Sequence, residues 1–360
     1  MDMAYKIFLN DHVPAGMLNL AAEIDEFKGR WEALKNIAPD RLSALRKVAT
    51  IASIGSSTRI EGAHLSNSEV ERLLSNIGRH SFANRDEEEV AGYSDAMNLV
   101  FDSFGDITVS ENHIRQLHGI LLKHSGRDRR HKGEYKKNPN DVEAFNAQGE
   151  SVGVVFETAT PFDTPFFMKD LVAWYNGEIA SRAFHPLLVI GGFAVHFLAI
   201  HPFQDGNGRL SRILTALMLL RSGYAYVPYC SLESIVEENK ERYYLALRRA
   251  QMSFKTDHAD MIEWLRFFLT LMKKQKDILA GKLEKEKAFS MESLPALAGR
   301  LLVFASERER LTLSDIVKCT EANRNTVKKH VQSLVRKGLL LQHGKGKGTW
   351  YSRADRPPAT

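Results

Sequence analysis

HPFQDGNGRLSR, at residues 201–212, places a histidine, a carboxylate, a Gly-Asn-Gly loop and two arginines close together in the chain. The loop at residues 206–208 carries little side-chain bulk, so its backbone N–H groups can turn toward a ligand and form a nest for an anion. A base, a carboxylate, an anion nest and two guanidinium groups are together typical of a site that acts on a polyphosphate.

A helix is predicted to follow this loop directly. Its apolar face repeats at helical spacing: Leu210, Ile213, Leu214 and Leu217. Gly223 marks its end. The loop therefore leads into a helix N-terminus, where unpaired N–H groups and the helix dipole attract an anion. Arg209 and Arg212 lie three residues apart on the flank of this face, so both are expected to reach the same phosphates.

Residues 186–203, which lead into this motif, contain no Asp, Glu, Lys or Arg. Two histidines, a Gly-Gly pair and a second proline make the run a poor membrane span, and we expect no membrane partner. A helix buried on all sides fits better, with Pro186 in its first turn and His201 at its end. His196, in the same helix, is interpreted as a core residue.

Residues 201–212 resemble the signature of the Fic family, His-x-Phe-x-(Asp/Glu)-Gly-Asn-Gly-Arg-x-x-Arg, and match it at every fixed position. The resemblance implies a mainly α fold, a Fic-type helical bundle with a small β-hairpin flap. It also implies a protein adenylyltransferase (AMPylator) that transfers AMP from ATP to a Ser, Thr or Tyr hydroxyl of a protein, itself included. Fic relatives that act as kinases have Lys at the position of Gly208, so Gly208 favours transfer of AMP.

The resemblance gives each polar residue of the motif a role. His201 is the candidate catalytic residue, a general base for the attacking hydroxyl, although an isolated histidine at the end of an apolar helix is more often a core residue. Asp205 is the candidate Mg²⁺ ligand, and a transition-metal pair with His201 is disfavoured because Pro202 and Gly206 interrupt a helix there. The candidate ATP-binding residues are Phe203, Gly206, Asn207, Gly208, Arg209, Arg212, Tyr243, Tyr244 and Gln251.

The last three candidates come from residues 239–251, which resemble the helix on the adenine side of the family's site. Paired tyrosines precede an Asn in that helix, and Gln251 stands where the Asn is usual. Aromatic residues at helical spacing are also typical of a core, so a packing role stays open for both tyrosines.

SSTRIEG, at residues 56–62, resembles the family's inhibitory motif, (Ser/Thr)-x-x-x-Glu-(Gly/Asn), with Ser57, Glu61 and Gly62 at its fixed positions. A carboxylate at Glu61 that reaches Arg212 would form a bidentate pair and occupy the guanidinium that should bind the γ-phosphate. The resemblance therefore implies autoinhibition by a helix that precedes the Fic core. A surface glutamate at a helix end is the alternative.

Residues 142–161 are predicted to form a β-hairpin around a turn at residues 148–149. The apolar residues that alternate after this turn are Val152, Val154 and Phe156. In the Fic family a hairpin flap in this place clamps the target by strand addition, so the implied partner is an unidentified target protein; a plain surface hairpin is the alternative. The family often has Gly-x-(Tyr/Phe)-Arg before the flap, and Lys136 replaces that arginine here.

The C-terminal segment is basic. From Met291 to the end, 13 Lys and Arg stand against six Asp and Glu, a net charge of +7, whereas the whole chain carries +5. A winged helix-turn-helix domain is predicted, with helices around residues 297–305, 313–319 and 323–337 and a hairpin tip at 344–348. A DNA partner fits this charge, and a protein partner is the alternative. The glycine spacing of the tip does not fit a phosphate loop.

Four parts are predicted in the chain of 360 residues. They are an N-terminal helical region with the inhibitory motif (1–105), the Fic core with flap and signature (106–258), a helical linker whose second half is solvated (259–290), and the winged helix-turn-helix domain (291–360). Only two cysteines, Cys230 and Cys319, and no sign of a secretion signal indicate a cytoplasmic protein.

Two other functions stay open from the sequence alone. The inhibitory glutamate could orient a water molecule, so that the chain removes AMP from modified proteins. Alternatively, the basic C-terminal domain dominates, and the protein is a nucleotide-sensing DNA-binding regulator. A homodimer stays open as well, since relatives often control the inhibitory helix through dimer contacts.

Overall fold

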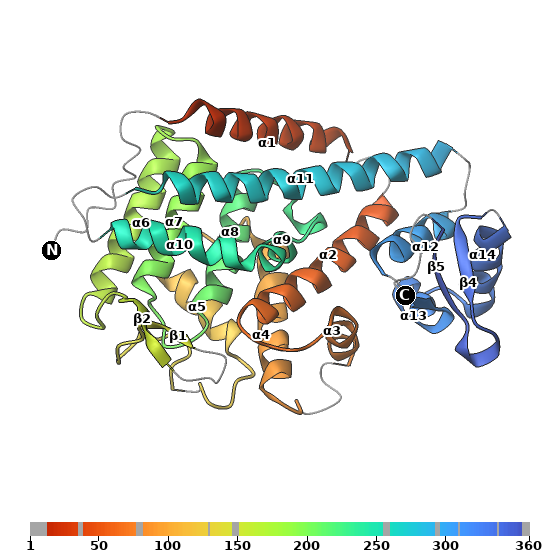
Figure 1. Cartoon of the computed structure of the whole chain (residues 1–360), viewed down its shortest axis with the longest axis horizontal. Helices are drawn as coiled ribbons and strands as arrows, with labels where there is room; N and C mark the ends of the chain where they lie inside the picture. Colours follow the sequence, from red (N-terminus) through yellow and green to blue (C-terminus); the bar gives the residue numbers. More distant parts are fainter. Residues whose placement is uncertain are drawn as a thin grey trace.

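The structure, a computed structural model, describes residues 13–34, 39–76, 82–128, 130–145, 151–254, 260–291, 296–308, 310–336 and 338–354. These residues form helices and two small antiparallel sheets (Figure 1). The helices of the main body are α1 (Ala15–Leu34), α2 (Pro39–Ile60), α3 (Asn67–Leu74), α4 (Arg85–Ser103), α5 (Glu111–Leu121), α6 (Thr164–Ser181), α7 (Pro186–Ile200), α8 (Asn207–Arg221), the 3-10 turn η1 (Val227–Tyr229), α9 (Leu232–Glu238), α10 (Lys240–Ser253) and α11 (Ile262–Met291). The mainly α fold class is confirmed.

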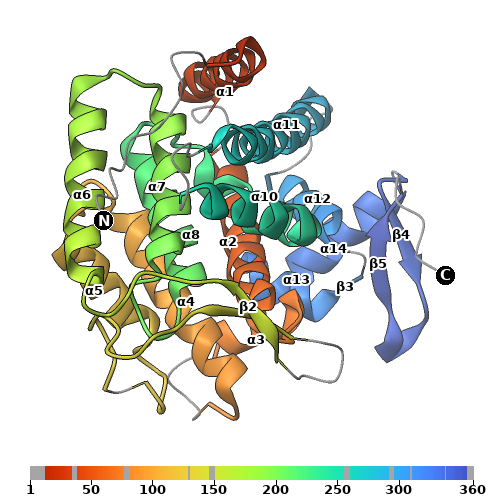
Figure 2. The same cartoon turned by 60° about the vertical axis from the view of Figure 1, so that its left-hand side comes forward.

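Helix α7 lies inside the main body, in contact with α6, α8, α10 and α11 (Figure 2). Every residue from Leu187 to Ile200 is buried, as the uncharged sequence predicts. Pro186 occupies the first turn, where the N–H that it lacks would have no partner in the helix. The burial of α7 on all sides fixes the position of His201, which follows its last residue.

His196 is a core residue of α7, as predicted. It is 5% exposed, and its ring stacks on Phe254 with 4.3 Å between the ring centroids. Burial lowers the pKa of His196 to about 3, so the ring is neutral. Among the helices that the structure describes, none is long and apolar enough to cross a membrane.

Helix α2 runs beside α4, α8, α9 and η1 and ends at Ile60. Gly62 then adopts a φ of 105°, a left-handed conformation that glycine accepts readily, and it reverses the chain. The following helix, α3, packs back on α2 and α4. Residues 57–61 therefore lie at the C-terminal end of α2, next to α8.

Strands β1 (Val142–Phe145) and β2 (Ser151–Phe156) pair antiparallel, with the first residue of β1 opposite the last residue of β2. The predicted hairpin is therefore present, although its turn at residues 148–149 lies outside the described residues. Phe156 is buried at the base of the hairpin, and β2 contacts α10.

The C-terminal segment forms a unit of helices and a three-stranded sheet in strand order β3-β5-β4. Its elements are α12 (Ala296–Glu307), β3 (Leu311–Thr312), α13 (Leu313–Thr320), α14 (Arg324–Arg336), β4 (Leu340–His343), the 3-10 turn η2 (Gly346–Gly348) and β5 (Trp350–Arg353). The order of three helices and a hairpin agrees with the sequence analysis, to which the structure adds β3. Its assignment as a winged helix-turn-helix domain stays a prediction.

The region predicted as a helical linker with a solvated second half forms α11, which packs on the main body. Helix α11 is continuous and packs on α1, α7, α9 and α10. Leu279 is fully buried, and the side-chain Nε2 of Gln275 donates to the Cys230 carbonyl at 2.6 Å. Lys282 forms an ion pair of 2.5 Å with Glu307 on α12. The second half of α11 is thus solvated only in part, because its charged residues leave one face free for packing.

Candidate active site

His201 is the residue directly after α7 and has a φ of 53°. Its N–H donates to the Phe197 carbonyl at 2.9 Å, and its ring Nδ1 lies 3.3 Å from the Leu198 carbonyl. Because a carbonyl only accepts, Nδ1 carries the proton of the neutral ring and Nε2 keeps a lone pair. Burial lowers the pKa of His201 to about 4. The ring is therefore neutral at pH 7 and can accept a proton at Nε2.

Buried side chains fix the conformation of the loop after His201. Asn207 Oδ1 accepts from the Phe203 N–H at 2.9 Å, and Asn207 Nδ2 donates to the Phe203 carbonyl at 2.6 Å. The Phe203 ring is fully buried and stacks on the His118 ring with 3.8 Å between centroids. Both side chains therefore fix the conformation of the loop, and ATP binding by Phe203 and Asn207 stays a prediction.

His118, on α5, fixes the backbone of Asp205. Its Nδ1 accepts from the Gly133 N–H at 2.9 Å, so the proton of the neutral ring is on Nε2, which donates to the Asp205 carbonyl at 3.0 Å. Burial lowers the pKa of His118 to about 4, which keeps the ring neutral.

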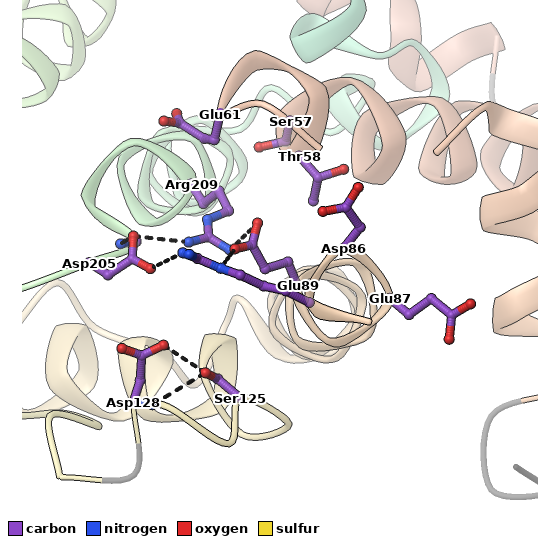
Figure 3. Close-up of polar contacts among 12 residues, drawn as sticks. Ser57, Thr58, Glu61, Asp86, Glu87, Glu89, Ser125, Asp128, Asp205 and Arg209 are labelled. Carbon is purple, nitrogen blue, oxygen red and sulfur yellow. Dashed lines mark hydrogen bonds and ion pairs between the residues drawn. The ribbon is translucent and has the colours of Figure 1, made fainter. Parts of the chain in front are cut away.

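Asp205 belongs to a cluster of charged side chains beside the loop (Figure 3). Its Oδ1 accepts from the Gly206 N–H at 2.6 Å and from Arg209 at 3.2 Å, and its Oδ2 accepts from Arg85 at 2.8 Å. Glu89 contacts Arg209 at 2.9 Å and Arg85 at 2.7 Å. Burial raises the pKa of Asp205, but Arg209, the Gly206 N–H and Arg85 outweigh burial and hold this pKa below its usual value. Asp205 is therefore a carboxylate at neutral pH.

Arg209 and Arg212 have different partners within the chain, and their shared contact with phosphates stays a prediction. Arg209 is 2% exposed and is held by Asp205 and Glu89. Arg212 faces α2 instead. Two residues that lie three apart on a helix differ in direction by about 60°, which is enough to separate their partners.

Arg212 joins α8 to the end of α2. Its Nη2 donates to Glu61 Oε1 at 2.7 Å and to the Ser57 carbonyl at 3.0 Å, and its Nε donates to Ser57 Oγ at 2.8 Å. The structure thus brings Ser57 and Glu61 of the inhibitory motif into contact with Arg212 of the signature. The Arg212–Glu61 pair has one hydrogen bond instead of the two predicted, and Ser57 accepts two more from the same guanidinium. Burial lowers the pKa of Arg212, but Glu61 and two tyrosines outweigh burial and raise it.

The Glu61 carboxylate lies against the first turn of α8. A methyl group on Gly208 would come within 2.1 Å of Glu61 Oε1, so the carboxylate rests on the glycine backbone. Figure 3 shows Glu61 next to α8, with Ser57 and Thr58 on the neighbouring α2. Unpaired N–H groups and the helix dipole attract an anion at this end of a helix. Glu61 therefore occupies the place that the sequence assigns to phosphates.

The end of α2 that carries Glu61 is anchored on α9. Arg59 Nε and Nη2 donate to the two carboxylate oxygens of Glu237 at 2.7 and 2.9 Å. Arg59 Nη1 donates to the Leu65 carbonyl at 2.8 Å, beyond the turn at Gly62. The Arg59 guanidinium thus fixes the backbone both before and after Glu61.

Tyr243, Tyr244 and Gln251 lie on α10. Tyr243 packs against Tyr244 with 5.2 Å between ring centroids, and it lines one internal cavity together with Arg212. Tyr244 is 39% exposed, whereas Tyr243 and Gln251 are buried. The structure brings Tyr243 to the Arg212 side of the site and leaves Gln251 in the core; their roles toward a nucleotide stay predictions.

Asp205 suits a magnesium ion by its charge and position. An ionised carboxylate is a hard oxygen donor, and this one adjoins the start of α8. Within the part of the chain that the structure describes, no three His, Cys, Asp or Glu side chains gather into a metal site. An ion at Asp205 would therefore take its other ligands from phosphate oxygens and water, and the half-exposed Arg85 would have to release Oδ2.

Sequence reasoning missed Arg85, Glu89 and His118 as parts of the site. Arg85 and Glu89 flank the acidic first turn of α4, residues 86–88, which is typical of an ordinary helix start. Arg85 lies 120 residues before Asp205, so spacing gives no signal of their contact. His118 lies on an amphipathic helix, where a single histidine carries no sequence signal of a functional role.

Three comparisons bear on this arrangement. A model of the Fic/DOC family matches residues 108–219. A protein adenylyltransferase Fic of Drosophila sechellia is 27% identical over 241 residues, which are 66% of this chain and 43% of that protein. Its counterpart from Drosophila persimilis is 28% identical over 243 residues, 66% of this chain and 42% of that protein. This chain thus spans less than half the length of these relatives.

Solved structures share the fold. A Fic family protein from Desulfovibrio desulfuricans superposes with a TM-score of 0.59 at 21% identity, over 97% of this chain and 98% of that one. A Fic domain containing signaling protein from Bacteroides thetaiotaomicron gives a TM-score of 0.59 at 23% identity, over 73% of this chain and 97% of that one.

Proposed function

We propose that this chain is an autoinhibited protein adenylyltransferase of the Fic family, whose model matches residues 108–219. It uses Mg-ATP to place AMP on a Ser, Thr or Tyr hydroxyl of a protein, itself included. One observation carries the proposal: the Glu61 carboxylate lies on the start of α8 and on Arg212, beside a neutral His201. An anion thus already fills the place that suits a phosphate.

In the transfer, the acceptor hydroxyl gives its proton to His201 Nε2 while its oxygen attacks the α-phosphorus of ATP. The bond from this phosphorus to the oxygen that bridges to the β-phosphate breaks, and diphosphate leaves. The N–H groups at the start of α8 receive phosphate oxygens, and Arg212 neutralises the γ-phosphate. A magnesium ion at Asp205 would screen the phosphate charges.

Glu61 is the brake in this proposal. Its negative charge repels the phosphates from the start of α8, and its bond to Arg212 withholds the cation that they need. The target protein lies along the β1–β2 hairpin, where an added strand would present its hydroxyl.

The test uses intact masses of the wild type, Glu61→Gly and Glu61→Gly/His201→Ala after incubation with Mg-ATP. Self-modification needs no knowledge of the target. We expect an AMP-sized gain that rises in Glu61→Gly and disappears in the double variant. No gain in any sample, with ATP still bound, would overturn the transferase proposal.

Removal of AMP from modified proteins is a second candidate. The Glu61 side chain is 30% exposed and lies within the site, so its carboxylate has room to orient a water molecule. AMP-modified Glu61→Gly protein, freed of ATP, is a substrate for this reaction. Loss of its AMP on addition of wild type, and none on addition of Glu61→Gly, would favour removal over transfer.

A DNA partner rests on the C-terminal unit. Arg324, Lys328 and Lys329 are exposed on α14, and the sequence of that helix has no acidic residue. Binding of the full chain to duplex DNA should weaken steeply as salt rises, because phosphate contacts release counterions. Absent binding, or binding that Lys328→Glu/Lys329→Glu leaves unchanged, would exclude this partner and favour a protein.

A further inference from the structure

Lys136 is a buried cation beneath the active site. It is 3% exposed, and its ammonium donates to Asn140 Oδ1 at 2.7 Å, to Thr158 Oγ1 at 2.8 Å and to the Ile200 carbonyl at 3.0 Å. An ammonium has three N–H donors, so each has a neutral acceptor here. Because burial of a charge without a paired carboxylate is costly, such a lysine calls for a reason beyond stability.

Lys136 and Asn140 bind the backbone around His201 at successive carbonyls. The Lys136 ammonium holds Ile200, Asn140 Nδ2 holds His201 at 3.1 Å and Phe203 at 2.7 Å, and the Lys136 N–H holds Pro202 at 2.8 Å. The carbonyls of residues 200–203 are thus all bound from one segment. A histidine in the left-handed region keeps that conformation only when its surroundings fix it.

The same two residues reach both ends of the hairpin. Lys136 and Asn140 precede β1, and Lys136 binds Thr158, which follows β2. Thr158 Oγ1 donates to Asn140 Oδ1 at 2.9 Å, and the Thr158 N–H donates to Asp141 Oδ1 at 2.8 Å. The Lys136 ammonium therefore binds residues at both ends of the hairpin and the backbone next to His201.

We propose that Lys136 and Asn140 are positioning residues, which set the β1–β2 hairpin and His201 in one fixed relation so that an acceptor held on the hairpin meets Nε2. This inference rests on the proposed transferase function. The contact of β2 with α10 does not involve the His201 loop, so it does not itself set that relation. The network around Lys136 supplies the missing link to the base.

The charge of Lys136 also acts on the base. After burial and the Leu198 carbonyl, Lys136 lowers the pKa of His201, and the carboxylates of Glu61 and Asp205 raise it. Burial lowers the pKa of Lys136 itself to about 8, against a smaller opposing effect of Asp141. Loss of this proton at alkaline pH would remove one of the three donors.

The experiment measures initial rates of self-modification against pH in the Glu61→Gly background. Lys136→Met should lower the rate at saturating ATP by about 100-fold with the KM for ATP unchanged, because the base is displaced from the acceptor. In Lys136→Met the fall of the rate at acidic pH should begin at higher pH, because loss of the positive charge raises the pKa of His201. Lys136→Arg, which keeps the charge, should retain more activity than Lys136→Met and move the alkaline limit upward.

Two further variants guard against an effect on folding. Thr158→Val removes one acceptor at constant shape and should lower the rate less than Lys136→Met. Lys132→Met is the matched control, because Lys132 also donates to a backbone carbonyl, that of Lys123 at 2.7 Å, away from His201; it should change neither rate nor pH profile.

The outcomes separate the two proposals. An active Glu61→Gly parent with Lys136→Met at the parent's rate and pH profile would overturn the positioning role and leave the transferase proposal intact. A rate loss that Lys136→Arg shares fully, with no shift of either pH limb, would reduce Lys136 to a structural residue and also overturn it. No transfer by the parent would overturn the transferase proposal, and the positioning role with it.

Discussion

At the scale of single residues, the geometry of His201 determines which form of the ring is present. The sequence predicts a base at this position from its neighbours in the motif. It could not predict that Nδ1 faces the Leu198 carbonyl or that the residue has a φ of 53°, because both depend on where α7 ends inside the core. Burial, a property of the whole fold, then lowers the pKa of His201.

This lowered pKa predicts the acid limb of the reaction. Burial favours the neutral ring, so the base form persists down to a pH of about 4, the pKa of His201, instead of the ordinary 6.5. Initial rates of self-modification by Glu61→Gly should therefore stay level from pH 7 to pH 6 and fall only in more acidic buffer. A midpoint at 6.5 would show an exposed, ordinary histidine and contradict this geometry.

Gly208 allows a test of where Glu61 lies. An alanine methyl at this position would come within 2.1 Å of Glu61 Oε1, and the carboxylate must move away. Gly208 has no left-handed φ, so alanine suits its backbone. Gly208→Ala should raise self-modification in the wild-type background and leave it unchanged or lower in the Glu61→Gly background. An equal loss in both backgrounds would place Glu61 elsewhere.

At the scale of elements, α2 is fixed from one side by α9. The apolar run of α7 and the hairpin were predictable from composition and alternation, because those signals are local. The Arg59–Glu237 pair was not, since its partners lie 178 residues apart and neither belongs to the fixed positions of a motif. Under the proposed autoinhibition, the position of Glu61 therefore depends on a contact outside the site.

Breaking this pair should release the brake in part. A partly buried bidentate pair is worth about 1.5 kcal/mol, which shifts the balance between bound and released Glu61 about tenfold. Arg59→Ala should therefore raise self-modification by the otherwise wild-type chain, measured as the rate of AMP-sized mass gain.

Arg46→Ala is the matched control on the same helix. Arg46 pairs with Asp102 on α4 at 2.5 Å, toward the other end of α2 from Glu61. This variant should leave the rate unchanged. An equal rise in both variants would mean that general loosening of α2, and not its anchor on α9, releases Glu61.

At the scale of the whole molecule, the C-terminal unit is attached to α2, α3 and α11 of the main body. Helix α12 packs on α2 and α11, and Glu71 on α3 binds both Arg308 and Cys319, the latter at 3.1 Å. The sequence predicts a separate basic module after a linker. It gave no sign of this attachment, because one glutamate on a short helix carries no pattern.

Removal of this glutamate should loosen the unit. Glu71→Ala leaves Arg308 without its carboxylate, so amide hydrogen exchange in α12 and α13 should accelerate while exchange in α7 stays slow. Arg72→Ala, at the exposed next position of α3, should change neither. Unchanged exchange in α12 and α13 would show that packing of α12 on α2 and α11 holds the unit without Glu71.

The central claim is transfer of the α-phosphoryl group with its nucleoside, restrained by Glu61. It is tested most directly by incubating the wild type and Glu61→Gly with ATP that carries a label either on the α-phosphate or on the γ-phosphate. We predict protein-bound label from α-labelled ATP only, more in Glu61→Gly than in the wild type. Label from γ-labelled ATP would show phosphorylation, and equal α-label in both proteins would remove Glu61 as the brake; either result would contradict the account.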